Sequence, residues 1–134
     1  MEVDFVNRVS VHKPVGYTHV VSIKDPGKVM YVSGQVAKDH QGKIVGVGDL
    51  ETQTRQAYEN LSSILKSQGA TFSDIVKMNI YTTRLDQIAS IRKVRDQYFS
   101  PDRLPATTLV GAAGLADKDF LIEIEAVAVL APGE

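Results

Sequence analysis

The run LIEIEAVAVL, from Leu121 to Leu130, constrains the fold of this chain most. Eight of its ten residues are apolar, as in a buried strand, yet Glu123 and Glu125 lie in its middle. Side chains of a strand alternate between two faces, so both glutamates share one face. The opposite face carries small or branched apolar residues, namely Ile122, Ile124, Ala126 and Ala128. Because an unpaired buried carboxylate is costly, we expect the apolar face to pack against helices and the glutamates to point away from them.

Two interpretations of the glutamate face stay open at this point. It is either a solvated or ion-paired surface at a subunit interface, or the wall of an interface cleft in which a carboxylate orients or activates water.

Composition excludes several classes of protein. The chain has 134 residues, of which 43% are hydrophobic and 23% charged, which suits one soluble domain over residues 1–134. A net charge of -1 gives no bias toward nucleic acid or an anionic membrane. The absence of cysteine excludes disulfides, thiolate metal sites and a cysteine nucleophile. No apolar run is long enough to span a bilayer and the N-terminal residues do not resemble a signal peptide, so we expect a cytoplasmic protein.

Hydrophobic periodicity and turn signals predict the order β-β-β-α-β-α-β-β. The expected elements are strands at 19–23 and 29–37, a short strand or extended arm at 44–48, a helix at 50–68, a strand within 72–83, a helix at 86–99, a strand within 105–115 and a strand at 120–130. Hairpin and helical connections are both present, which favours a two-layer α+β domain with a mixed sheet and two helices on one face. The other sheet face then requires a subunit partner as its cover.

Other candidate motifs predict no metal or phosphate site. His12, His19 and His40 show no metal-ligand spacing, so we interpret them as surface or structural residues. The glycines of 46–48 precede a helix, but two acidic residues at its start would repel a phosphate, so we interpret them as a turn.

Two arginines lie on or near the apolar arc of the second helix. At about 100° per residue, Arg95 falls inside that arc and Arg92 at its edge. For Arg95 we favour a stem that is buried while the charged head reaches solvent. For Arg92 two interpretations stay open: a buried stem with its charged head in solvent, or a guanidinium that points into a cleft or a subunit interface.

Six fragments, in this order and with close spacing, resemble the Rid family, also called the YjgF family. They are SGQVA (33–37), QTRQAYENLSSIL (53–65), GATFSDIVKMNIYTT (69–83), DQYF (96–99), LPATTLVG (104–111) and LIEIEAVAV (121–129). The resemblance implies a chorismate-mutase-like α+β fold and a homotrimer with its sheets packed inside. It also implies ligand pockets between neighbouring subunits. Well-known members hydrolyse reactive enamines and imines, such as 2-aminoacrylate, to a keto acid and ammonia, with no metal or organic cofactor.

The resemblance carries over to the site only in part. Tyr17, Ser33 and Gly34 match positions that line the family's pocket, and Glu123 matches the glutamate that holds the hydrolytic water. Glu125 is then expected to be structural and paired across the trimer.

The arginine of the family, which binds the substrate carboxylate through two hydrogen bonds, is replaced here. It should follow Pro105-Ala106, where this chain has Thr107, and the cysteine expected two residues later is Leu109. Thr107, Thr108 and Leu109 are therefore expected to line the pocket without a charge. Where deaminating members carry a pocket asparagine, this chain has Arg92, which suggests either a relocated anion clamp or an Arg92–Glu123 ion pair that closes the pocket.

Two functions follow from this pattern. One is a hydrolytic deaminase or related hydrolase of a small imine or enamine, in which Glu123 positions water and Arg92 holds the anion. The alternative is a non-catalytic small-molecule-binding, regulatory or chaperone-like trimer of the same fold, favoured by the loss of the arginine at Thr107.

Overall fold

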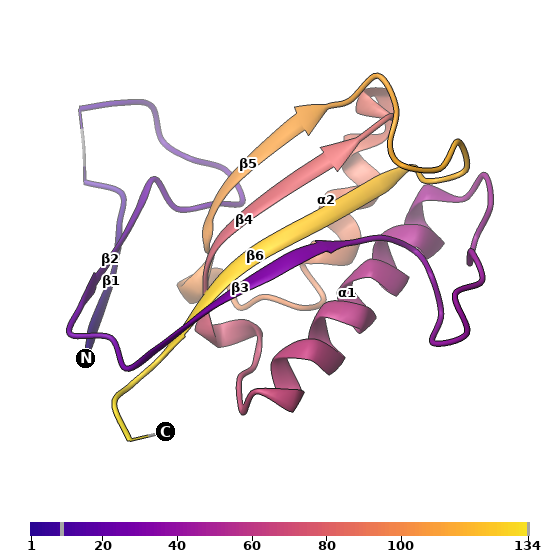
Figure 1. The fold of residues 1–134 in the computed structure, drawn as a ribbon. Coiled ribbons are helices and arrows are strands. Elements are labelled where there is room, and N and C mark those ends of the chain that lie inside the picture. The colour runs from indigo at the N-terminus through magenta and orange to yellow at the C-terminus, as the bar shows by residue number, and fades with distance from the viewer. Residues whose placement is uncertain (9, 134) are drawn as a thin grey trace.

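The computed structural model describes residues 1–8 and 10–133, which form a four-stranded sheet covered by two helices, with a separate two-stranded sheet beside it (Figure 1). The strands are β1 (Glu2–Val6), β2 (Val20–Lys24), β3 (Lys28–Gln35), β4 (Ile75–Thr82), β5 (Ala106–Gly111) and β6 (Ile122–Leu130). The helices are α1 (Leu50–Ser67) and α2 (Ile88–Arg95), with short 3-10 turns at Phe72–Asp74, Leu85–Gln87 and Pro101–Arg103. None of the helices in this part of the chain is long and apolar enough to cross a membrane.

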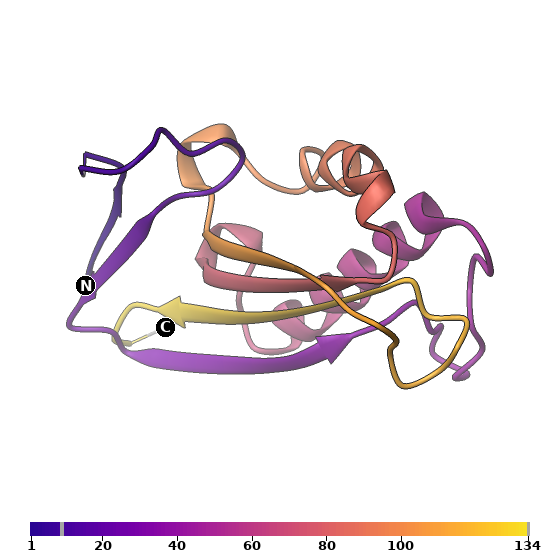
Figure 2. The same ribbon diagram turned by 90° about the horizontal axis from the view of Figure 1, so that it is seen from above.

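The main sheet is mixed, as expected for an α+β fold. Its strand order is β3-β6-β4-β5, in which β4 and β5 run parallel while β6 is antiparallel to both β3 and β4 (Figure 2). The two helices pack on one face of this sheet, so the predicted two-layer arrangement is confirmed.

The alternation in β6 explains which face the helices cover. Ile122, Ile124, Ala126 and Ala128 are buried in the core, whereas Glu123, Glu125 and Val127 are only half-buried on the other side. The small alanines let helical side chains approach the strand closely, so the apolar face of β6 lies under the helices as predicted. We call the opposite side, which no helix covers, the open face.

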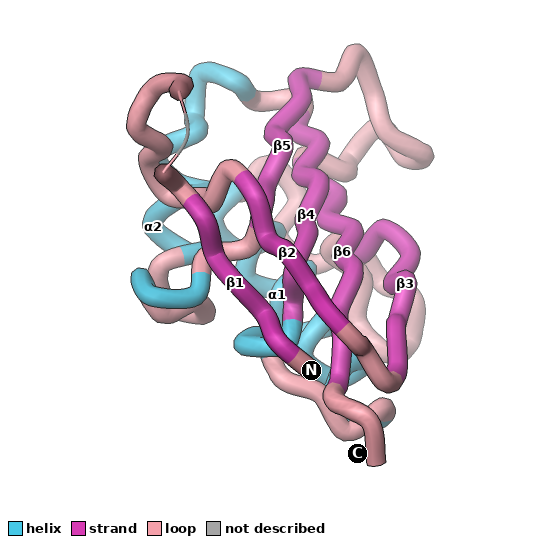
Figure 3. Tube along the Cα trace, turned by 90° about the vertical axis from the view of Figure 1, so that its left-hand side faces the viewer, coloured by secondary structure: helices cyan, strands magenta, loops and turns pink. Residues whose placement is uncertain are grey.

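Two expectations from the sequence are wrong. Strand β1 was not predicted; it pairs antiparallel with β2, beside which it lies in Figure 3, and the two form a sheet separate from the main one. The segment 44–48 is neither the short strand nor the extended arm that was expected: only Ile44 forms an isolated bridge, with Lys38, and residues 46–48 form a turn. Gly46 and Gly48 have φ angles of +75° and +78°, a left-handed conformation that glycine adopts without strain and that interrupts an extended strand.

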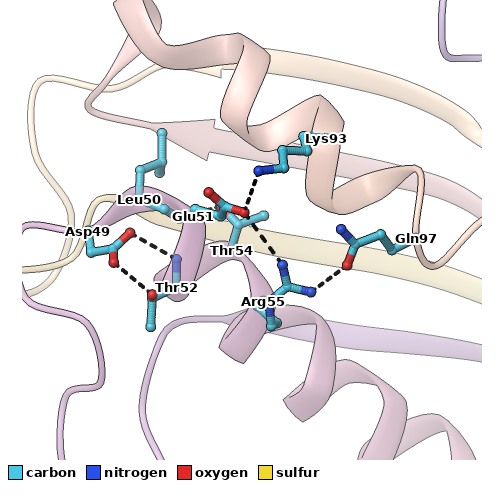
Figure 4. A network of polar contacts seen from close by, with 8 residues as sticks. All are labelled: Asp49, Leu50, Glu51, Thr52, Thr54, Arg55, Lys93 and Gln97. Carbon is cyan, nitrogen blue, oxygen red and sulfur yellow. Dashed lines mark hydrogen bonds and ion pairs between the residues drawn. The ribbon is translucent and has the colours of Figure 1, made fainter.

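Polar contacts fix the start of α1 and join it to α2 (Figure 4). Asp49 accepts hydrogen bonds from the backbone N–H and the hydroxyl of Thr52, at 3.1 and 2.8 Å, and these bonds lower the pKa of Asp49. In the first turn of α1, Glu51 forms ion pairs with Lys93 of α2 at 3.1 Å and with Arg55 at 3.6 Å. Such exposed pairs stabilise a fold only slightly.

Candidate functional site

The open face of the sheet carries a polar network centred on Glu125. Its carboxylate accepts hydrogen bonds from Tyr81 at 2.7 Å and from Asn79 at 2.9 Å. These bonds, with that of Tyr81 the larger effect, lower the pKa of Glu125. Both partners lie on β4 of the same chain, so these bonds form within one subunit, and the expected pairing of Glu125 across a trimer stays a prediction. A shallow cavity of about 370 Å³ lies over this network, between Tyr31 and Lys77.

Glu123, the other glutamate of β6, lies against the backbone of Gly34. A Cβ atom added to Gly34 would collide with Oε2 of Glu123, so only glycine leaves room for this carboxylate. The pairing of β3 with β6 shifts by one residue between Val32 and Gln35, which places a bulge at Ser33 and Gly34. Within the described residues, no hydrogen bond or ion pair engages the Glu123 carboxylate. It is therefore free to bind water or a ligand.

A second cavity, of about 130 Å³, brings together four of the predicted site residues. It lies where α2 and the N-terminal loop meet β4 and β5, and its lining includes Tyr17, Arg92, Thr107 and Leu109. Thr108 does not belong to this group, because it lies on the open face and its hydroxyl accepts a hydrogen bond from Lys77 at 3.0 Å.

The two groups of residues lie on opposite faces of the sheet. Thr107 and Leu109 are in register with Met78 and Ile80, which are buried under the helices. Glu123 is in register with Tyr81, on the open face. Paired residues share a face, so one chain by itself cannot bring Glu123 to the cavity that Arg92 lines. The Arg92–Glu123 ion pair considered above is absent from the described part of this chain.

The structure contradicts the expectation for Arg95 and places Arg92 at a cavity, which is one of its two open interpretations. The side chain of Arg95 is only 13% exposed; it donates hydrogen bonds to Asp96 at 2.8 and 3.1 Å and lies over Gly16 so closely that a Cβ there would overlap the guanidinium. The sequence suggested that the charged head of Arg95 reaches solvent, but in the structure this head is mostly covered. Arg92 is exposed at the cavity, and within the described chain its guanidinium has no hydrogen-bond or ion-pair partner.

Thr107 does not replace the arginine of the family. Its hydroxyl donates a hydrogen bond of 3.0 Å to the carbonyl of Pro105, two residues earlier. The one proton that this side chain can donate is therefore used within the strand, and Arg92 is the residue of the cavity that can best bind an anion.

The histidines form no metal centre, since the described residues contain no group of three side chains that could hold an ion. Two of them lie beside the second cavity instead. A hydrogen bond of 2.8 Å joins Nε2 of His12 and the hydroxyl of Tyr17, and His19 packs against both rings. His12 lacks metal-ligand spacing to the other histidines, and its position five residues before Tyr17 is the one sequence signal for this contact.

Comparisons with known proteins agree with this fold. A family model described as Endoribonuclease L-PSP matches residues 10–130. A RutC family protein of Pyrococcus abyssi is 34% identical over 117 residues, which are 87% of this chain and 88% of that protein. The 2-iminobutanoate/2-iminopropanoate deaminase of Dermatophagoides farinae is 29% identical over 88% of this chain and 89% of that protein.

Among solved structures, the Rid-family protein YyfB of Yersinia pestis, described as a protein of unknown function, has a TM-score of 0.88 to this one. It is 31% identical, and the alignment covers 97% of this chain and 100% of that protein. Because the family model and these relatives span nearly the whole chain, the protein belongs to the Rid (YjgF) family, to which the Endoribonuclease L-PSP model corresponds.

Proposed function

We propose that this protein is a hydrolytic deaminase, or a closely related hydrolase, that acts on a small imine or enamine in a pocket between copies of a homotrimer. The observation that carries the proposal is the separation of the two groups described above. A free carboxylate lies at Glu123 on the open face, and a free guanidinium lies at Arg92 on the other side of the sheet.

The open face supports an assembly of several copies. It exposes apolar side chains, with Tyr31 83% exposed, Val29 43% and Val110 40%. No helix covers these residues, and a second copy would bury them. If the open face of one copy lies against the edge strand β5 of its neighbour, where Thr107 lines the Arg92 cavity, Glu123 of the first copy and Arg92 of the second would complete one site.

The chemistry required of each residue is simple. Arg92 would bind the carboxylate of an imino acid and hold its C=N carbon near Glu123. Glu123 would accept a proton from water as the water oxygen bonds to that carbon and the π electrons move to nitrogen, which takes up a proton from solvent to give the neutral carbinolamine. In the resulting carbinolamine the hydroxyl loses a proton, the nitrogen gains one, and the C–N bond breaks to give ammonia and a keto acid. The relative named as a 2-iminobutanoate/2-iminopropanoate deaminase supports this choice of substrate class.

The alternative is a non-catalytic, ligand-binding trimer. One observation favours it: the hydroxyl of Thr107, at the position of the family's arginine, is bonded to its own strand. RNA cleavage, which the description of the family model suggests, is not favoured by the net charge of -1, which gives no overall basic bias toward nucleic acid.

Ammonia release from an imino acid generated in the assay separates these possibilities. Wild type should release ammonia faster than the buffer reaction, and Glu123→Gln, which keeps the shape but not the base, should lose that advantage. Glu2→Gln, in β1, is the matched control and should behave as wild type. An inert wild type with an active Thr107→Arg variant would instead show a competent scaffold without deaminase activity, which is the alternative.

A further inference from the structure

A cluster of three rings lies at the mouth of the Arg92 cavity. Tyr17 lines this cavity, and a hydrogen bond of 2.8 Å joins its hydroxyl to Nε2 of His12. Nε2 of His19 donates a hydrogen bond of 2.7 Å to the carbonyl of His12, because a carbonyl can only accept. The rings of His12 and His19 meet edge to face, with centroids 4.9 Å apart. The His12 imidazole is therefore held in place against the Tyr17 hydroxyl.

We propose that His12 and Tyr17 form a proton relay that supplies the proton with which ammonia leaves. The inference rests on the proposed function and adds the general acid that it lacks. Tyr17 is the catalytic residue because it lines the cavity, and His12 is a positioning and proton-supplying residue that acts through it.

Elimination among the described residues that line the cavity points to Tyr17. Arginine stays protonated in proteins, so neither Arg92 nor Arg95 can give up a proton. The proton of the Thr107 hydroxyl is directed to Pro105. The remaining side chains, those of Val15, Ile80, Ile91 and Leu109, carry no exchangeable proton. The Tyr17 hydroxyl is thus the group of this cavity that can act as an acid.

The proton balance of the step is closed. In the carbinolamine, the Tyr17 O–H gives its proton to the amine nitrogen as the C–N bond breaks and that electron pair leaves with ammonia. Nε2–H of His12 returns a proton to the phenolate oxygen, and Nδ1 of His12 takes up a proton from solvent. His12 is exposed, so this exchange with bulk water is open. Glu123 takes one proton as the water adds and releases it to solvent, and it then takes the hydroxyl proton as the keto group forms, so the acid and the base of this step are separate groups.

Variants of His12 test the relay against a purely structural role. His12→Gln keeps a hydrogen-bonding partner for Tyr17 but cannot pass a proton, and should lower kcat by about 100-fold with KM changed less than about twofold. His12→Ala should be equally slow and should recover activity when free imidazole is added. In Tyr17→Phe, imidazole should restore nothing. His40→Gln, an exposed histidine in a distant turn, is the control and should match wild type.

The outcomes separate this inference from the proposed function. If wild type releases ammonia and His12→Gln is as fast, the relay is wrong while the deaminase proposal stands. A slow His12→Ala variant that imidazole does not rescue also overturns the relay, because it indicates a structural role. If wild type itself is inert, both proposals fall.

Discussion

Gly34 and Glu123 are in direct contact, since the glutamate carboxylate occupies the space that any larger residue at position 34 would fill. Gly34→Ala should therefore displace the carboxylate and slow ammonia release at least about tenfold, because small misplacements of a catalytic group are costly. The collision is with the flexible end of a side chain, so the free energy of unfolding should change by less than about 1 kcal/mol.

Gly114→Ala is the matched control for this prediction. Nothing lies within 4 Å of a Cβ at Gly114, and that glycine has no positive φ angle. Its activity should equal that of wild type. Equal activity of Gly34→Ala and Gly114→Ala would show that the position of Glu123 does not matter for the reaction.

Arg92 and Arg95 should respond differently to removal of the side chain. Arg92→Ala should leave the melting temperature unchanged and raise the Kd of a keto acid such as pyruvate about 30-fold, which corresponds to about 2 kcal/mol. Lys93→Ala, on the exposed side of the same helix, should leave Kd unchanged. Arg95→Ala should instead lower the melting temperature, because its side chain is mostly covered and packs over Gly16. Calorimetric titration measures the first effect, and an unchanged Kd in Arg92→Ala would exclude the relocated anion clamp.

The Glu125 network should give a pH-dependent contribution to stability. Its hydrogen bonds from Tyr81 and Asn79 lower the pKa of Glu125 in the folded state. A carboxyl whose pKa is lowered by folding stabilises the fold above its unfolded pKa, and this contribution disappears as pH falls through the folded pKa. Tyr81→Phe should therefore reduce the melting temperature at neutral pH, and the difference from wild type should vanish in acid. A difference that is the same at both pH values would contradict this assignment.

Loss of the Gln53 side chain should disturb the loops around Gly46 and Asp119 more than loss of any other polar side chain. It is fully buried, donates to the carbonyls of Gly46 at 3.1 Å and Asp119 at 2.8 Å, and accepts from the N–H of Leu121 at 2.9 Å. Gln53→Leu keeps the volume but leaves these groups unpaired, so the free energy of unfolding should fall by about 2–4 kcal/mol.

Gln56→Leu, one turn along the same helix on a half-buried position, provides the comparison for Gln53. It should cost less than about 1 kcal/mol in a denaturant titration. Equal losses of unfolding free energy in the two variants would mean that the buried hydrogen bonds of Gln53 do not stabilise the fold more than the contacts of Gln56.

The sequence predicts the main sheet well because residues that face the helices and residues that face away from them alternate regularly along its strands. The alternation in β6 correctly assigns its apolar residues to the helices and both glutamates to the open face. Prediction from the sequence fails where the backbone departs from regular geometry. Gly46 and Gly48 convert the expected short strand or extended arm into an irregular segment. Strand β1 alternates as well, but it is short and carries two acids, so its signal is weak.

The candidate site is harder to predict because it depends on contacts between distant segments. A helical wheel places Arg95 and Arg92 relative to the apolar arc, but it cannot show that Gly16 lies under Arg95 and leaves Arg92 free. The link between His12 and Tyr17 depends on the path of an irregular loop, for which no periodicity exists.

Each site is proposed to combine Glu123 of one copy with Arg92 of another. Mixing two variants that are each inactive tests this shared site most directly. Glu123→Gln and Arg92→Ala subunits, coexpressed with different tags and purified together, should regain ammonia release although each alone is slow. Trimers that carry both tags contain two copies of one variant and one of the other, so one of their three interfaces holds both intact residues and about one third of the wild-type rate is expected. A mixed assembly that is no faster than its separate components would contradict a site shared between subunits.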